Sequence, residues 1–444
     1  MQQRMYLRLG MLVATVVCLA LAGTSARQAT AITFWWWGEE EAPGLERWLN
    51  ETVQLFEQEN PQLRIELVRQ TTEGLIPASQ AAAAAQTGPD LQYYWPVAWF
   101  LEHMWNGFLV PLDDLIPEEV EHYAPVFRQY ASWRGKTYGA PLYMIGNPWI
   151  YNKALFAQAG LDPDHPPGTW DELLAAGEKL RSAGIIPIAG GMKDQFFADF
   201  PWLVVQPETL DSVNQFFNTF LGLDGSQFTD PPYVAVWERL QELIERGFFP
   251  EDINSLDLYE GFDLFRQEKA AMAFPVQPLS VQWARELGAD KVGIMLTPSF
   301  ADGALGDTIQ TATQYVAVPV WSRHPQEAAQ FIKFMHRPER MLALDITAGA
   351  LMGDDRMDTS QLFTPIEREM FELTLTRSAI SVYYVAPPNI TEWTWPNFGE
   401  LINGTITPQQ AAERAAQLNA QWRQLNPDTV ANFIEWMRSF QAGP

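Results

Sequence analysis

The only cysteine of this 444-residue chain, Cys18, lies inside an apolar N-terminal segment. The ten residues before the segment carry two arginines and no acid, residues 11–23 are apolar or small, and small residues at 24–26 or at 29–31 suit cleavage. This is the pattern of a secretory signal, and we predict a signal peptide over residues 1–26. The mature chain would have no cysteine, so a large hydrophobic core rather than disulfides must hold this exported protein together.

The same segment leaves the mode of attachment open. It is shorter than the about 20 residues that span a bilayer comfortably, although an uncleaved anchor is an alternative. Val17 precedes Cys18 where a lipoprotein signal has a small residue, so lipid attachment is the weaker alternative. We expect a protein that is secreted across the cytoplasmic membrane and is periplasmic or associated with the cell surface.

The composition is that of a globular, acidic protein. Hydrophobic residues make up 47% and charged residues 19% of the chain, and the length favours two domains. Removing residues 1–26 takes away two of the 29 basic residues and no acid, so the formal net charge changes from −25 to −27. Such a charge, with no basic stripe to offset it, argues against nucleic acid and anionic lipid head groups as partners.

Three adjacent tryptophans mark the predicted first strand. Residues 32–38 read Ile-Thr-Phe-Trp-Trp-Trp-Gly and are followed by three glutamates at 39–41. Because side chains alternate across a strand, Trp35 and Trp37 should face one way and Trp36 the other. Aromatic rings beside carboxylates suit a neutral, hydroxyl-rich ligand such as a sugar, and core burial is the alternative.

Predicted helices and strands alternate in the manner of an α/β protein. Hydrophobic spacing and boundary residues predict the elements. Strands are expected over 32–36, 63–68, 91–95, 185–189, 271–274 and 314–320, and helices over 45–59, 81–85, 170–183, 234–246, 325–336 and 408–440.

Several segments in this order resemble one protein family. The most specific are Gly-Lys-Thr-Tyr-Gly-Ala-Pro at 135–141 and Tyr-Asn-Lys-Ala-Leu-Phe at 151–156. The others lie at 32–38, 56–61, 88–91, 107–113, 160–163, 169–173, 269–272, 325–332 and 407–411. In order and spacing the chain resembles the extracellular solute-binding proteins of ABC importers, in the sugar-binding branch that includes maltose-binding protein.

The resemblance implies an α/β fold of the two-lobe periplasmic-binding-protein type (type II-like), with a ligand cleft between discontinuous lobes joined by hinge segments. Lobe 1 would comprise 32–141 and 299–345, and lobe 2 would comprise 142–298 and 346–444 with the C-terminal helices. Such proteins close on their ligand about the hinge. The implied partners are a small-molecule ligand, the permease transmembrane subunits and separate ATPase subunits; the protein would be a monomer, not an enzyme, and without a cofactor.

The resemblance also selects candidate ligand-binding residues, acids as hydrogen-bond acceptors and aromatic rings as stacking surfaces. They are Trp37, Glu39, Glu40, Tyr94, Trp95, Tyr143, Asn147, Phe197, Asp199, Trp202, Gln277, Thr313, Trp393 and Trp395. On the first strand we expect Trp35 to pack under the sheet and Trp37 to reach the ligand, with Trp36 undecided. For Glu39 and Glu40 the alternative is a role at the start of a helix, where the helix dipole favours acids.

This chain departs from the family pattern at three places. Gln277 stands where relatives have a Gly-x-Trp segment, polar residues 310–314 stand where relatives often have two glycines, and residues 349–352 lack a proline. The missing tryptophan puts the usual sugar pose in question, and polar side chains around Thr313 could replace backbone contacts to the ligand.

The candidate residues favour an uncharged ligand. None is a lysine or arginine, which a phosphorylated or sulfated sugar would require, so we predict a neutral sugar or short oligosaccharide. Two acids and several rings would also suit a polyamine or another cationic solute, which is the main alternative.

Enzyme and metal chemistry have weaker support in the sequence. Glycoside hydrolases use two carboxyl groups, and Glu39 or Glu40 with Asp199 could form such a pair. Gly-Lys-Thr at 135–137 lacks the first glycine of a phosphate loop, because Tyr130 occupies that position, and is expected to be a hairpin turn. The five histidines at 103, 122, 165, 324 and 336 are too far apart for a local zinc motif.

Overall fold

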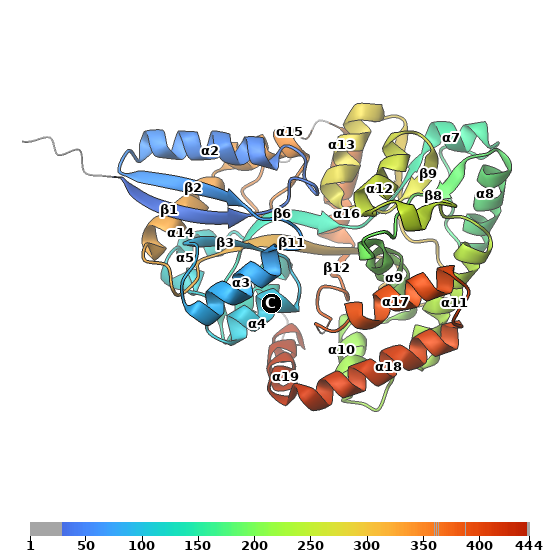
Figure 1. Cartoon of the computed structure of the whole chain (residues 1–444). Coiled ribbons are helices and arrows are strands. Elements are labelled where there is room, and N and C mark those ends of the chain that lie inside the picture. Colours follow the sequence, from blue (N-terminus) through green and yellow to red (C-terminus); the bar gives the residue numbers. More distant parts are fainter. Residues whose placement is uncertain (1–28, 359, 361, 363, 387, 442–444) are drawn as a thin grey trace, which may run out of the picture.

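Two separate β-sheets divide the molecule into two halves (Figure 1). The computed structural model describes residues 29–441 apart from 359, 361, 363 and 387, so the predicted signal peptide and Cys18 lie outside the described residues. The first sheet has six strands in the order β12-β11-β3-β1-β2, with β6 also paired to β11. The second sheet has four strands in the order β10-β7-β9-β8.

The strands of the first sheet are β1 (Thr30–Trp36), β2 (Leu63–Arg69), β3 (Leu91–Tyr94), β6 (Ala140–Gly146), β11 (Ile309–Ala317) and β12 (Ser378–Ile380). Those of the second sheet are β7 (Trp149–Asn152), β8 (Ile186–Ile188), β9 (Ala270–Ala273) and β10 (Val292–Met295). A hairpin of β4 (Ser132–Trp133) and β5 (Lys136–Thr137) confirms the turn predicted at the Gly-Lys-Thr segment.

Helices surround both sheets. The first half contains α2 (Leu45–Glu59), α3 (Leu75–Ala85), α4 (Ala98–Trp105), α5 (Pro117–Val120), α6 (Pro125–Tyr130), α14 (Pro325–Met335) and α15 (Pro338–Ala348). The second half contains α7 (Lys153–Gln158), α8 (Trp170–Ser182), α9 (Asp199–Val205), α10 (Val213–Leu221), α11 (Pro231–Glu245), α12 (Leu258–Arg266), α13 (Gln277–Leu287), α17 (Thr391–Ile402) and α18 (Pro408–Leu425). Two more, α16 (Pro365–Thr376) and α19 (Pro427–Gln441), contact both halves.

The alternating burial of β1 explains its place in the sheet. Ile32, Phe34 and Trp36 are buried, whereas Trp35 is only half-buried. The Phe34 side of the sheet is covered by α14 and α2: the Phe331 ring of α14 packs against Phe34 at 6.4 Å and against Phe56 of α2 at 5.1 Å. The expectation that Trp35 packs under the sheet is therefore wrong, since Trp36 occupies the core.

The predicted elements are confirmed at most positions. The helix predicted over 45–59 coincides with α2, and the predicted helical tail is α18 and α19. One strand is shifted, because the segment predicted over 314–320 is β11 over 309–317. Polar Gln310, Thr311 and Thr313 are buried in β11, since this strand pairs with β6 and β12 where it begins. The hydrophobic pattern of the sequence therefore does not show where β11 begins.

Three segments carry the chain between the halves. They are 147–148 between β6 and β7, 296–308 between β10 and β11, and 381–390 between β12 and α17. The change of lobe predicted at 345–346 is too early, because the Met144 amide donates to the Leu351 carbonyl and β12 joins the first sheet. The lobe 1 boundary at 141 is also early, because β6 pairs with β11 up to Gly146. Apart from these two differences the lobe boundaries stay our proposal.

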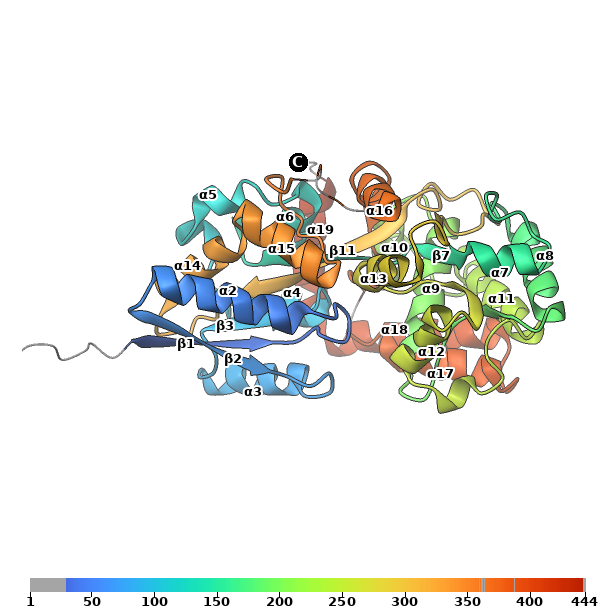
Figure 2. The same ribbon diagram turned by 90° about the horizontal axis from the view of Figure 1, so that it is seen from above.

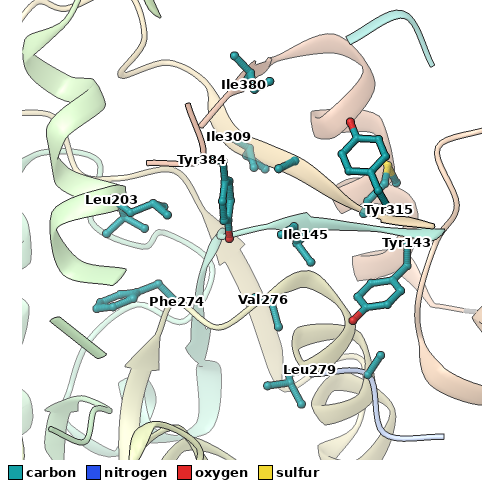
Figure 3. Close-up of a cluster of buried hydrophobic side chains, with 14 of the residues drawn as sticks. Tyr143, Ile145, Leu203, Phe274, Val276, Leu279, Ile309, Tyr315, Ile380 and Tyr384 are labelled. Atoms are coloured by element: carbon teal, nitrogen blue, oxygen red, sulfur yellow. The ribbon is translucent and has the colours of Figure 1, made fainter. Parts of the chain in front are cut away.

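Hydrophobic side chains gather where the halves meet. Ile145 of β6, Leu203 of α9, Phe274 and Tyr384 gather there (Figure 3). From above, β11 and α13 lie between the two halves (Figure 2). On α19, Trp436 packs against Tyr130 of the first half and Phe217 of the second. Within the part of the chain that is described, no helix is long and apolar enough to cross a membrane.

Candidate ligand-binding site

A cavity of about 430 Å³ lies between the two halves and is lined by both. The first half contributes Trp37, Glu41, Thr72, Ile76, Gln80, 95–99, Glu102, Ile145 and Gln314. The second half contributes Phe196, Asp199, Phe200, Leu203, Leu258, Tyr259, Thr391 and Trp395. The crossing segment contributes Tyr383, Tyr384, Ala386, Pro388 and Ile390. A larger hollow of about 590 Å³ lies beside β8, but the second half alone lines it. The interlobe cavity is therefore the one that hinge motion would close.

Tryptophan rings form the wall on the side of the first half. Trp37 follows β1, and its indole Nε1 donates to Thr72 Oγ1 at 3.0 Å. The ring of Trp95 stands edge-on to Trp37, with centroids 5.2 Å apart and planes at 89°. Behind it, Trp99 of α4 donates from Nε1 to Ser79 Oγ at 3.2 Å. These hydrogen bonds fix the orientation of two of the rings.

Glu41 is a buried carboxylate that the first half contributes to the lining of the cavity. Tyr143 Oη donates to its Oε2 at 2.8 Å, and Gln314 Nε2 donates to the same oxygen at 2.6 Å. Burial raises the pKa of Glu41 to about 7, although these two hydrogen bonds oppose the shift, and the nearby charge of Glu40 adds to it. Gly38, with a φ of 123°, turns the chain so that Glu41 reaches this position.

Asp199, at the first position of α9, is a buried carboxylate that the second half contributes to the lining of the cavity. Its Oδ1 accepts from Thr394 Oγ1 at 2.6 Å, and its Oδ2 accepts from Tyr383 Oη and Trp395 Nε1, each at 2.8 Å. Burial raises the pKa of Asp199 to about 6, and the three hydrogen bonds oppose the shift. The Trp395 ring packs edge-on against Phe196 at 5.1 Å.

The cavity is acidic and aromatic. Glu102 of α4 is a third lining carboxyl group, and burial raises its pKa. Among the described lining residues none is lysine, arginine or histidine. The described part of the chain also holds no group of three or more His, Cys, Asp and Glu residues that could bind a metal ion.

Comparison with known proteins identifies the family. The model of the family described as bacterial extracellular solute-binding protein matches residues 39–341. The chain belongs to this family. The predicted resemblance and two-lobe fold are confirmed, and because the family is one of binding proteins, the prediction that the chain is not an enzyme is confirmed as well.

Relatives and solved structures agree with that assignment. A binding protein of Brucella abortus (strain 2308) is 24% identical over 74% of this chain and 77% of its own length. An ABC transporter extracellular-binding protein of Pyrococcus horikoshii is 25% identical over 71% of each chain. Among solved structures, a chitin oligosaccharide binding protein has a TM-score of 0.77 at 21% identity, covering 88% of this chain and 98% of its own. A maltose-bound protein of T. maritima has a TM-score of 0.72 at 19% identity, covering 89% and 100%.

Four of the predicted site residues of this solute-binding protein line the cavity, namely Trp37, Trp95, Asp199 and Trp395. A fifth, Tyr143, lies directly behind the cavity, where it holds Glu41. These residues come from the segments directly after β1 and β3 and from β6, α9 and α17, so the fold brings together segments far apart in the sequence.

Glu39 and Glu40 lie outside the cavity. Glu39 accepts from the backbone amides of Gly44 and Glu46 at 2.8 and 2.7 Å, where α2 begins. Glu40 forms an ion pair with Arg69 of β2 at 2.6 Å, and both side chains are about two-fifths exposed. The carboxylate pair considered for glycoside hydrolysis is therefore not assembled.

The remaining candidates are buried away from the cavity. Tyr94 Oη lies 3.0 Å from His103 Nδ1, Thr313 Oγ1 donates to the Tyr143 carbonyl at 2.9 Å, and Gln277 Nε2 donates to the Gly349 carbonyl at 3.2 Å. Phe197 stacks on Phe274, Trp202 packs edge-on against Trp393, and Asn147 lies near β7 in the crossing segment. Gln277 and Thr313 therefore serve contacts within the protein.

Several lining residues are not among the predicted site residues. Glu41 stood beside the two selected glutamates, and the start of α2 at Leu45 could have shown which acids cap the helix. Tyr383 and Tyr384 form a polar-aromatic pair in a segment with no predicted element. Tyr259 on α12 carried no signal, because it contributes to a helix whose other face is core.

Proposed function

We propose that this protein is the solute-binding component of an ABC importer and that it captures a neutral sugar or short oligosaccharide. Outside the cytoplasmic membrane it would close about the hinge segments and deliver the solute to a permease with separate ATPase subunits. The observation that carries the proposal is the interlobe cavity, with indole rings on both walls, buried carboxylates as acceptors and no cationic side chain among the described lining residues.

The relatives support a sugar more than a phosphate ester. Structures with this fold include a chitin oligosaccharide binding protein and two solute-binding proteins described as bound with maltose and with α-D-tagatose. A glycerol-3-phosphate-binding protein of Escherichia coli (strain K12) is 27% identical, but over only 52% of this chain and 53% of its own. Phosphate recognition relies on arginine, lysine or clustered amides, and Glu41, Glu102 and Asp199 would repel an anion here.

A cationic solute is the second candidate. The observation that favours it is that the described donors to Glu41 and Asp199 are all neutral groups: tyrosine, glutamine, threonine and tryptophan. An ammonium group would compensate these carboxylates and contact the ring faces of the cavity.

Calorimetry with the purified mature protein tests both candidates. Maltose, N,N′-diacetylchitobiose, tagatose and spermidine would be titrated at low and high ionic strength. A sugar should bind with an affinity that hardly changes with salt, whereas a cation should bind more weakly as salt screens the carboxylates. Small-angle scattering should show a smaller radius of gyration with the bound solute. Binding of glycerol 3-phosphate in place of these probes would contradict the proposal.

A further inference from the structure

We propose that the two buried carboxylates of the cavity have different roles, with Glu41 accepting hydrogen bonds from the solute and Asp199 acting as a positioning residue that holds the aromatic wall. This inference rests on the proposed function of the interlobe cavity as the solute site. It assigns different roles to two carboxylates, whereas the family assignment does not distinguish them.

The hydrogen bonds of Asp199 are nearly saturated within the protein. Three donors reach its two oxygens at 2.6 to 2.8 Å, and the residue is 3% exposed. A carboxylate has about four lone-pair positions, so little acceptor capacity is left for a solute. The donors Tyr383 and Trp395 are themselves lining residues and come from the crossing segment and from α17. Asp199 therefore joins three segments and fixes the directions of two rings.

The hydrogen bonds of Glu41 are one-sided. Tyr143 and Gln314 both donate to Oε2, and Oε1 accepts no hydrogen bond from the described residues. Tyr143 is held in turn by Tyr93, with the two hydroxyl oxygens 3.1 Å apart. Two fixed donors on one oxygen orient the carboxylate, so Oε1 is the acceptor available to a solute.

Ionisation of Glu41 changes what Oε1 can do. Because Oε2 accepts two hydrogen bonds, a proton on this carboxyl group would sit on Oε1 and make it a donor. Burial raises the pKa of Glu41 to about 7, so the change falls near neutral pH. The titratable groups around it are Glu40 in the same segment, Tyr93 of β3, Tyr143 of β6, Tyr259 of α12 and Tyr384, with Glu102 and Asp199 lining the same cavity.

Paired substitutions separate the two roles. In Asp199→Asn the amide oxygen can still accept hydrogen bonds from Tyr383 and Trp395. The new NH₂ group faces the Thr394 hydroxyl, which can accept from it and can donate its own proton to the Ile390 carbonyl 3.1 Å away. Asp199→Ala removes all three hydrogen bonds. Glu41→Gln keeps the acceptor for its two protein donors and replaces Oε1 by an NH₂ donor. Glu40→Gln is the matched control, because Glu40 is outside the cavity and pairs with Arg69.

The first measurement needs no solute. The indole N–H resonance of Trp395, assigned with Trp395→Phe, should shift and broaden in Asp199→Ala, return close to its wild-type position in Asp199→Asn, and stay in place in Glu41→Gln. Thermal melts would confirm that each variant is folded. An unchanged Trp395 resonance in folded Asp199→Ala would overturn the positioning role.

The second measurement uses the four calorimetric probes at pH 6 and pH 8. For a probe that binds the wild type, Glu41→Gln should bind about tenfold or more weakly at pH 8, since it removes a charged acceptor, and the difference should shrink at pH 6, where most of the wild-type carboxyl group is protonated. Asp199→Ala should lose a similar factor, and Asp199→Asn should recover most of it. Wild-type affinity of Glu41→Gln at pH 8, or equal losses in both Asp199 variants, would overturn the division. If no probe binds the wild type, the proposed function and the role of Glu41 both fail, while the Trp395 resonance still decides the role of Asp199.

Discussion

The two walls of the cavity carry the same chemical group in different surroundings. Glu41 and Asp199 are 8% and 3% exposed, and burial raises the pKa of both. In the first wall one oxygen of the carboxylate has no donor among the described residues, whereas in the second wall three donors reach the carboxylate. Burial and residue type therefore do not identify a binding group by themselves. The placement of the neighbouring hydrogen-bond donors decides whether a buried carboxylate can accept from a solute.

The largest expected effect concerns two tryptophans of α17 in the second wall. Trp393 is fully buried against Trp202 and Phe228, so Trp393→Ala should lower the free energy of unfolding by about 3–5 kcal/mol. Trp395 is only partly buried and lines the cavity, so Trp395→Ala should cost less stability and should weaken solute binding. Urea unfolding and calorimetry measure the two effects. Equal losses of stability in the two variants would contradict the assignment of Trp393 to the core and of Trp395 to the cavity wall.

The next effect tests the charge state of the first wall. In the unfolded chain Glu41 ionises near pH 4.5, whereas in the folded protein it stays protonated until about pH 7. Its contribution to stability is therefore present below pH 4.5 and is lost as the pH rises to 7. Glu41→Gln does not titrate, so it should be as stable as the wild type near pH 4.5 and more stable by about 2–3 kcal/mol at pH 8.

Unfolding by urea at pH 4.5, 6, 7 and 8 measures this difference. Glu40→Gln is the control, and its stability relative to the wild type should show no comparable rise between pH 4.5 and 8. A constant difference between Glu41→Gln and the wild type over the whole range would show that Glu41 titrates normally in the folded protein.

A third, smaller effect tests the tryptophan run. Trp37→Ala should weaken solute binding by about 10- to 100-fold, because the indole ring lines the cavity and is held by Thr72. Trp35→Ala should leave the affinity within about twofold, because Trp35 is half-buried on the sheet and does not line the cavity. Calorimetry on folded variants decides this, and a similar loss of affinity in both would contradict the assignment of Trp37 to the wall.

The smallest effect separates the helix cap from the binding wall. Glu39→Ala should lower the free energy of unfolding by about 1 kcal/mol, because its carboxylate caps the first amides of α2. Its affinity for the solute should match that of the wild type. Weaker solute binding without a change in the free energy of unfolding would show that Glu39 belongs to the binding site.

Much of the fold was predictable because local patterns determine it. The helical spacing over 45–59 ends at Asn60-Pro61, and α2 ends there. The site was predictable only in part: Trp37, Trp95, Asp199 and Trp395 line the cavity, whereas Trp202 and Trp393 are core. Trp393 and Trp395 are two positions apart on one helix, so their side chains point about 200° apart around the helix axis. This difference in direction decides which ring is buried.

The sequence by itself determined the family, the two-lobe α/β fold and the richness of the chain in aromatic and acidic residues. Only the tertiary structure decided that Glu41, rather than Glu39 or Glu40, lines the cavity. The reason is physical: the start of α2 and Arg69 of β2 engage the first two glutamates, and Tyr143 and Gln314 from distant strands orient the third. Contacts between residues about 100 and 270 positions apart in the chain are not encoded in any local pattern.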